Sequence, residues 1–173
     1  MKTKLLEPGK YYHVYNRAKN GDPLFEDEEA YRFFLKLYQA HICPIAETYA
    51  YCLLSDHLHF LIRIREEAEG SLFKPFAMLF NAYSKGYNHH NGKEGRVFKF
   101  KLKRIEIREI PCFQEMIRYV NQNPWRHGVT EHPANSYKMV MDESNNKIIA
   151  YIEIEDPATF WKLSKYAVIE VNN

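Results

Sequence analysis

The chain has 173 residues, of which 46% are hydrophobic and 27% are charged. This length suits one compact domain, and the hydrophobic share is large enough to form a core, which excludes a disordered protein. The formal net charge is only +2 at pH 7, so overall charge alone does not indicate a nucleic-acid partner. The three cysteines are widely spaced, which argues against a disulfide framework and against a cysteine zinc site. The polar N-terminus and the absence of a long apolar run predict a cytoplasmic protein with no membrane partner.

The first segments of the chain predict a strand followed by a helix. Residues 10–17 are rich in aromatic and β-branched side chains, and the turn residues 20–23 follow them. Asp27 is suited to cap a helix, with two glutamates in its first turn, and apolar residues then recur at helical spacing. We therefore predict a helix over residues 27–41.

Two strands are predicted next, over residues 48–54 and 57–64, joined by a turn at Ser55 and Asp56. Because strand side chains alternate, the second of these strands has an apolar face and a polar face. The apolar face consists of Leu58, Phe60, Ile62 and Ile64, and the opposite face carries His57, His59, Leu61, Arg63 and Arg65.

The second half of the chain predicts a helix that starts at Leu72 and ends at residues 89–92, and a strand over 96–107. A third helix has Pro111 at its first position and is stopped by Pro124, and a further strand is predicted over 148–154. This order of elements is the split βαβ pattern of an α+β, ferredoxin-like domain, with an antiparallel sheet and helices packed on one face. We assign residues 1–145 to that domain. Residues 146–173 are predicted to be a C-terminal extension, a strand plus a short helix, packed on it.

His57 and His59 stand at positions i and i+2 of a strand and so project side by side from one face, which allows two imidazoles to share a metal ion. The alternative is a pair of incidental histidines. Tyr119 and Asn123 lie one turn apart on the third helix. This spacing would let the phenol act on a phosphate while the Asn123 amide oxygen helps to bind the metal, although simple packing of Tyr119 at the rim of the helix is the alternative.

Basic side chains are concentrated between residues 96 and 108, with Glu106 as the single acid among them. Such a stripe fits a polyanionic partner, but a solvated strand face would look the same. Its members are Arg96, Lys99, Lys101, Lys103, Arg104 and Arg108.

Five segments carry a family resemblance, in this order: YHVYNR (12–17), PLF (23–25), AYCLLSDHLHFLI (50–62), RVFKFKLK (96–103) and YVNQNPWRHG (119–128). Together they resemble the HUH class of single-strand tyrosine transposases, and most closely the REP-associated tyrosine transposases of bacteria. The resemblance implies an endonuclease and strand transferase that acts on single-stranded DNA at or near hairpins. Tyr119 would attack a phosphodiester and leave a 5′-phosphotyrosine link and a free 3′-hydroxyl.

The same resemblance implies a catalytic site at the sheet/helix edge, with His57, His59 and Asn123 as ligands of Mg²⁺ or Mn²⁺. Two imidazoles and one amide oxygen suit Mn²⁺ better. It also implies a nucleoid-associated bacterial protein, and it leaves a homodimer open, because relatives include both dimers and monomers. The DNA contacts would be Arg17, Arg96, Lys99, Lys101, Lys103, Arg104 and Arg126.

The sequence departs from the family at Ser55 and Asp56, where Pro-Asn is common, and at Trp125, where a small aliphatic residue is usual. Asp56 places an anion beside the histidines, which favours a cation there but repels a phosphate backbone. A relative that binds structured single-stranded DNA, or RNA, without cleaving it is the alternative function.

Overall fold

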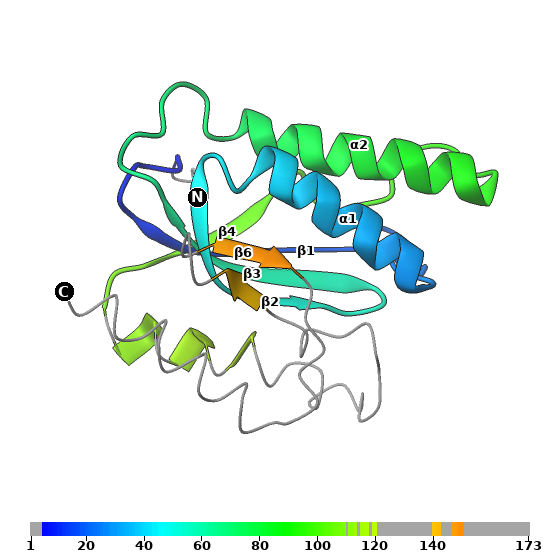
Figure 1. The fold of residues 1–173 in the computed structure, drawn as a ribbon. Coiled ribbons are helices and arrows are strands. Elements are labelled where there is room, and N and C mark those ends of the chain that lie inside the picture. The colour runs from blue at the N-terminus through cyan, green and yellow to red at the C-terminus, as the bar shows by residue number, and fades with distance from the viewer. Residues whose placement is uncertain are drawn as a thin grey trace.

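The computed structural model describes residues 5–109, 111–113, 115–117, 119–120, 140–142 and 147–150. Figure 1 shows a central sheet with two long helices lying along one side of it. The elements are β1 (Tyr11–Arg17), α1 (Glu28–His41), β2 (Ala46–Leu53), β3 (His57–Ile64), α2 (Lys74–Asn91), β4 (Lys103–Ile107), β5 (Val140–Asp142) and β6 (Lys147–Ala150).

The main sheet has four strands in the order β2-β3-β1-β4, and each strand is antiparallel to its neighbours. β1 and β2 therefore run in the same direction with β3 between them, which is the split βαβ arrangement. This confirms the predicted α+β class with an antiparallel sheet. β5 and β6 form a separate two-stranded antiparallel sheet, and β6 contacts β2. The predicted strand over residues 148–154 overlaps β6. The remainder of that strand and the short helix predicted after it lie outside the described residues.

The bounds of both long helices agree with the predicted ones to within two residues. The Asp27 side chain accepts a hydrogen bond from the Ala30 amide at 2.8 Å and caps α1. α2 ends at Gly92, whose φ of 58° places it in the left-handed region that glycine tolerates best. No helix in the described part of the chain is long and apolar enough to cross a membrane.

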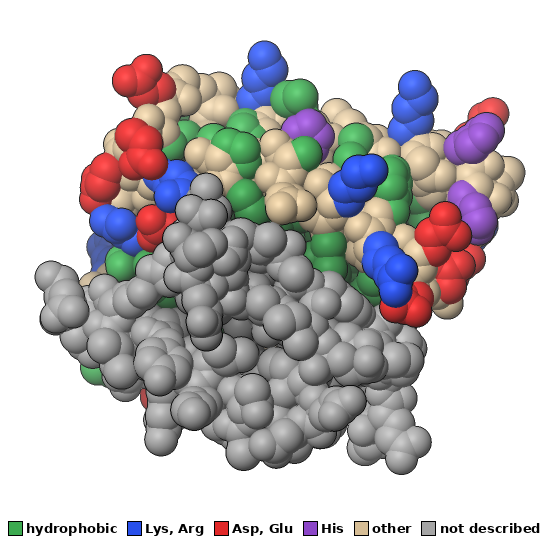
Figure 2. Space-filling view, in the orientation of Figure 1, with side chains coloured by type: hydrophobic (Ala, Val, Ile, Leu, Met, Phe, Trp, Pro, Cys, Tyr) green, Lys and Arg blue, Asp and Glu red, His purple; other side chains and the backbone are tan. Residues whose placement is uncertain are grey.

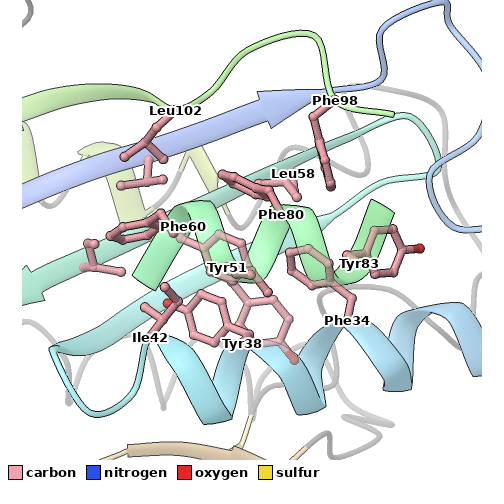
Figure 3. Close-up of a cluster of buried hydrophobic side chains, with 14 of the residues drawn as sticks. Phe34, Tyr38, Ile42, Tyr51, Leu58, Phe60, Phe80, Tyr83, Phe98 and Leu102 are labelled. Carbon is pink, nitrogen blue, oxygen red and sulfur yellow. The ribbon is translucent and has the colours of Figure 1, made fainter. Parts of the chain in front are cut away.

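The main core lies between the two long helices and one face of the sheet, and most of its large members are aromatic (Figure 3). The rings of Tyr38 and Phe60 are nearly parallel, with centroids 4.3 Å apart. The Tyr38 hydroxyl is 2.7 Å from the Thr48 hydroxyl, and the Tyr83 hydroxyl donates to the Leu24 carbonyl oxygen. The buried phenols thus have polar partners, which avoids the cost of burying a hydroxyl alone.

A second, smaller core lies on part of the opposite face of the sheet. The described residues between 111 and 120 are helical, and Phe113, Ile117 and Val120 are buried there. They pack with Ala50 of β2 and Leu61 of β3. The expectation that helices pack on one face therefore holds for α1 and α2, and the third helix adds a layer on the other face, because its apolar seam matches this second set of strand residues.

The predicted strand over residues 96–107 is shorter in the structure, where only Lys103–Ile107 forms β4. Phe98 makes an isolated bridge with Ala18. Between these two places, the buried Asn16 side chain bonds the backbone of Phe100, with Nδ2 donating to its carbonyl at 2.9 Å and Oδ1 accepting from its amide at 3.2 Å. A side chain thus replaces the ladder of a strand at this point.

Candidate functional site

His57 and His59 lie on the face of the sheet opposite α1 and α2, as the alternation of β3 predicts. Their neighbours on β1 are Arg17, which is paired with His57, and Tyr15, which is paired with His59. His59 is 8% exposed, and the His57 side chain is 16% exposed. The two imidazole rings meet edge to face, with centroids 5.3 Å apart. The structure therefore brings the predicted pair together at the end of β3.

A third histidine joins this pair. His13 of β1 is 5% exposed, and its Nε2 is 2.8 Å from Nδ1 of His59. Burial lowers the pKa of His13 to about 4, so its ring is neutral at pH 7. Sequence reasoning missed His13, although strand alternation puts it on the same face as Tyr15 and Arg17. What the sequence lacks is the pairing of β1 with β3, which is set by contacts far apart in the chain.

The two hydrogen-bonded rings are nearly coplanar, with 12° between their planes and 5.1 Å between their centroids. This centroid distance is too long for face-to-face contact, but it fits two rings joined edge to edge by a 2.8 Å hydrogen bond. The arrangement is therefore a hydrogen bond in the common plane of the rings rather than a stack. It fixes the rotation of His59 about its side-chain bonds.

Asp56 holds the other histidine. Its Oδ1 is 2.6 Å from Nδ1 of His57, and its Oδ2 is 3.9 Å from the Arg17 guanidinium. Partial burial would raise the pKa of Asp56, but the hydrogen bond and charge of His57, together with Arg17, outweigh it and lower that pKa. The Asp56 carbonyl also accepts a hydrogen bond from the Ala18 amide at 2.7 Å, which ties the β2–β3 turn to the end of β1.

Each histidine of the predicted metal pair thus has its Nδ1 engaged by another side chain, Asp56 for His57 and His13 for His59. Nε2 is then the nitrogen with which each of the two imidazoles could bind a metal ion. Metal-binding histidines characteristically use their second ring nitrogen in this way, with a carboxylate or another polar partner that orients the ring. In the described part of the chain, no group of three or more His, Cys, Asp or Glu side chains could hold a metal ion. The third predicted ligand, Asn123, lies outside it.

Tyr119 lies beside the histidines of its own chain. Its ring centroid is 5.7 Å from that of His59 and 5.9 Å from that of His13, and it meets both rings edge-on. The neighbouring Ile117 and Val120 are buried in the second core, whereas Tyr119 is only partly buried against it. Packing of the helix therefore holds the phenol at the boundary between this core and the histidines.

Three of the predicted DNA contacts lie close to this group. Arg17 is paired with His57, and its carbonyl accepts a hydrogen bond from the Lys99 amide at 2.8 Å. Lys103 of the edge strand β4 is paired with Tyr15 of β1, and Tyr15 is paired on its other side with His59 of β3. Among the described residues, Lys99, Lys101 and Lys103 form no ion pair with an acid, so their charges are available to a partner.

The remaining predicted contacts are farther away or lie outside the description. Arg104 is on the other face, where its guanidinium stands 5.3 Å from the centre of the Phe73 ring. Arg96 is exposed and lines a cavity of about 210 Å³ with Lys19 and Lys93. Arg126 falls outside the described residues. The structure thus separates Arg104 from the histidines and places the backbone of Lys99 and Lys103 beside β1, next to them.

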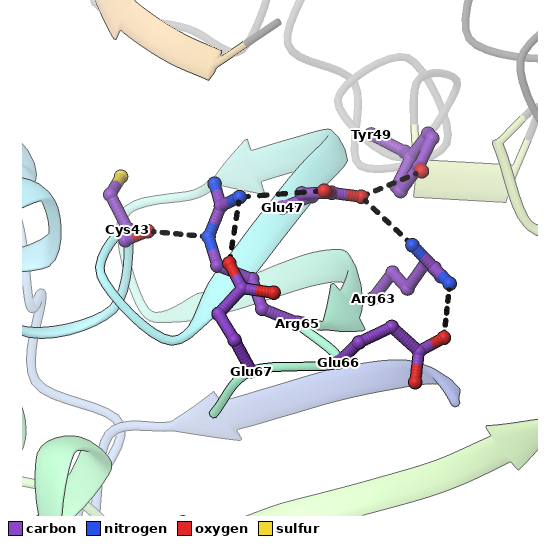
Figure 4. Close-up of polar contacts among 7 residues, drawn as sticks. All are labelled: Cys43, Glu47, Tyr49, Arg63, Arg65, Glu66 and Glu67. Atoms are coloured by element: carbon purple, nitrogen blue, oxygen red, sulfur yellow. Dashed lines mark hydrogen bonds and ion pairs between the residues drawn. The ribbon is translucent and has the colours of Figure 1, made fainter. Parts of the chain in front are cut away.

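Other parts of the surface carry balanced charge. At the far end of β3, Arg63 and Arg65 both reach Glu47, at 3.7 and 3.4 Å, and each also meets a further glutamate (Figure 4). On the side seen in Figure 2, acidic and basic side chains are interspersed over the described surface. What sets apart the segment beside His57 and His59 is that three lysines with no ion pair to an acid among the described residues, Lys99, Lys101 and Lys103, stand at alternate positions of one short stretch.

The sequence matches no protein-family model and no curated protein. Among solved structures, the chain is similar to one described as the structure of the REP-associated tyrosine transposase bound to a REP hairpin. The two share 15% sequence identity and a TM-score of 0.58, and the match covers 90% of this chain and 91% of that one. The chain has the fold of that transposase. At this identity the likeness is one of fold.

Proposed function

We propose that this protein binds hairpin or single-stranded DNA and cleaves and rejoins one strand, with Tyr119 as the nucleophile. The observation that carries the proposal is the position of the Tyr119 ring, 5.7 Å from the ring of His59 in the same chain. A tyrosine beside an oriented histidine that could bind a metal ion suits phosphodiester chemistry, because the phenol and the phosphate both need activation. The fold shared with a hairpin-bound transposase supports the choice of partner.

In the proposed reaction, the Tyr119 oxygen attacks the phosphorus of a DNA phosphodiester and loses its proton. The bond to the 3′ oxygen breaks, which leaves a 5′-phosphotyrosine and a free 3′-hydroxyl, and attack by a 3′-hydroxyl reverses the step. His57 and His59, with Asn123, would hold Mg²⁺ or Mn²⁺. When bound, such an ion supplies positive charge to a phosphate oxygen as negative charge develops. Asp56 and His13 keep the two imidazoles oriented for this role.

A covalent-adduct assay tests the proposal. Labelled DNA hairpins with single-stranded flanks are incubated with the protein and Mn²⁺, and denaturing gels reveal protein-linked DNA. We expect an adduct that disappears in Tyr119→Phe and persists in Tyr49→Phe, a control that removes a different phenol packed near the same helix. Hairpin binding with no adduct in the wild type, across a library of hairpin sequences, would replace the nuclease with the non-cleaving binder.

The position of Tyr119 beside His59 also supports action within one chain. We expect a mixture of Tyr119→Phe and His57→Ala to form no adduct, since neither chain then has both the phenol and the complete histidine pair. Adduct formation by the mixture would show that tyrosine helices are exchanged between chains, as in a homodimer.

The basic segment is proposed to follow the phosphate backbone. Each phosphate contact releases counterions, so replacing three lysines should reduce the slope of log affinity against log salt by about 2 to 3. We expect this for the triple alanine variant at Lys99, Lys101 and Lys103. The matched control carries alanine at Lys36, Lys74 and Lys85, which are exposed on α1 and α2. Equal slopes for the two variants would exclude this segment as the DNA track.

A further inference from the structure

The hydrogen bond between His13 and His59 has a direction that matters for metal binding. Both rings are buried, their facing nitrogens are 2.8 Å apart, and a hydrogen bond uses one proton, so one nitrogen of the pair donates it and the other accepts it. We infer that His13 is a positioning residue that accepts this bond from Nδ1 of His59, and that it thereby keeps Nε2 of His59 able to bind the metal ion. The inference rests on the proposed function, since it concerns the ion that His57 and His59 would share.

Two arrangements of protons are available when each ring carries one proton. In the first, His13 donates from Nε2, so His59 accepts at Nδ1 and must carry its own proton on Nε2, where it blocks metal binding. In the second, His59 donates from Nδ1 and its Nε2 presents a lone pair. Only the second arrangement is compatible with a metal ion at His59 Nε2. Metal binding therefore selects the tautomer in which His13 is the acceptor.

This selection has a consequence inside the protein. When His13 accepts at Nε2, its own proton lies on Nδ1, and that atom is buried without a hydrogen-bond partner. An N–H group in such a place is disfavoured, so the arrangement that binds metal is not stabilised by the surroundings of His13. The ion must select it. Side chains at position 13 should therefore be ranked by their ability to accept a hydrogen bond from His59.

The two histidine rings also form the surface against which Tyr119 packs edge-on. A change at His13 could thus alter cleavage simply by moving Tyr119, and activity alone would not separate the two roles. Metal affinity measured without DNA does separate them, because Tyr119 is not among the proposed ligands. The protonated nitrogen of His59 is a second readout that packing does not determine.

The test measures Mn²⁺ dissociation constants of the DNA-free protein by electron paramagnetic resonance of the free ion. Loss of a partner that orients a ligand typically weakens metal binding roughly 10- to 100-fold, and we expect this for His13→Phe, which keeps a ring but cannot accept. His13→Gln, whose amide oxygen can accept, should restore affinity to within a few-fold of the wild type. Ile105→Ala is the matched control, because Ile105 is paired with His13 and is 51% exposed.

The outcomes are distinguishable. If the wild type binds neither Mn²⁺ nor Mg²⁺, the proposed metal site itself is wrong, and this inference fails with it. If the wild type binds Mn²⁺ and His13→Phe binds it within about twofold, the inference alone is overturned; it is also overturned if His13→Gln is as weak as His13→Phe. Nitrogen-15 spectra of the Mg²⁺-saturated wild type test the inference directly, even where a variant does not fold. A proton on Nδ1 of His59 supports the inference, and a proton on its Nε2 refutes it.

Discussion

Replacing Asn16 by alanine should both destabilise the fold and weaken DNA binding. Asn16 is 1% exposed, and its side chain makes three hydrogen bonds, two to the backbone of Phe100 and one from the Arg17 amide at 2.9 Å. Alanine leaves these backbone groups without their partner. At about 1 kcal/mol for each bond lost, we expect the free energy of unfolding to fall by about 3 kcal/mol.

The expected loss of DNA binding follows from the hydrogen bonds between the Asn16 side chain and the Phe100 backbone. Phe100 stands between Lys99 and Lys101, so the two bonds from Asn16 fix the basic segment against β1. We expect urea denaturation to show the loss of stability, and fluorescence anisotropy at several salt concentrations to show severalfold weaker hairpin binding. Asn88→Ala is the control, because it removes a single exposed hydrogen bond to the Gly95 carbonyl. A loss below about 1 kcal/mol together with unchanged hairpin affinity would refute this role of Asn16.

Two further predictions concern the stability of the helical layer. Burial raises the pKa of Tyr31 to about 12 from an ordinary value of 10.0, so the folded chain keeps a proton that the unfolded chain loses above pH 10. The stability that this proton contributes is complete below pH 10 and is lost as the pH rises towards 12. Between pH 9 and pH 11, urea unfolding should show the wild type losing about 1 kcal/mol more than Tyr31→Phe. Equal losses in the two proteins would contradict the burial effect. Alanine at Gly86 would place its Cβ 2.6 Å from the Phe33 ring. Gly86→Ala alone should therefore raise the free energy of unfolding little. In a Phe33→Ala background the same substitution should raise it by about 1 kcal/mol, as measured by thermal unfolding. An equal increase in both backgrounds would exclude the clash.

The elements that sequence predicts well are those whose signals are local. The cap at Asp27 and the stop at Gly92 each depend on a few neighbouring residues. The separation of Phe60 from His59 onto opposite faces of β3 follows from alternation alone. The buried seam of the third helix, with Phe113 and its partners, is of the same kind, because helical periodicity fixes which side chains share a face.

Features that depend on contacts between distant segments could not be predicted in this way. His13 and His59 are 46 positions apart, and nothing near either residue specifies their hydrogen bond. Asn16 and Phe100 are 84 positions apart, and their bonds interrupt a segment whose alternation predicts an unbroken strand. The place of the third helix on the second face has the same cause, since its seam fits residues of β2 and β3 that the sequence does not mark as its partners.

The location of the candidate site follows from how the two faces of the sheet are filled. Aromatic side chains from α1 and α2 pack against one face, which is therefore buried in the main core. The second core covers only part of the other face, and His59 lies at its edge with 8% of its surface exposed. An imidazole buried to this extent needs a hydrogen-bond partner, and His13 supplies one on the neighbouring strand. The hydrogen bond to His13 thus both offsets the cost of burying the His59 imidazole and orients that ring. If the proposed metal site exists, His13 contributes both to the fold and to the orientation of a ligand, so variants of His13 should be judged by metal affinity and by unfolding together.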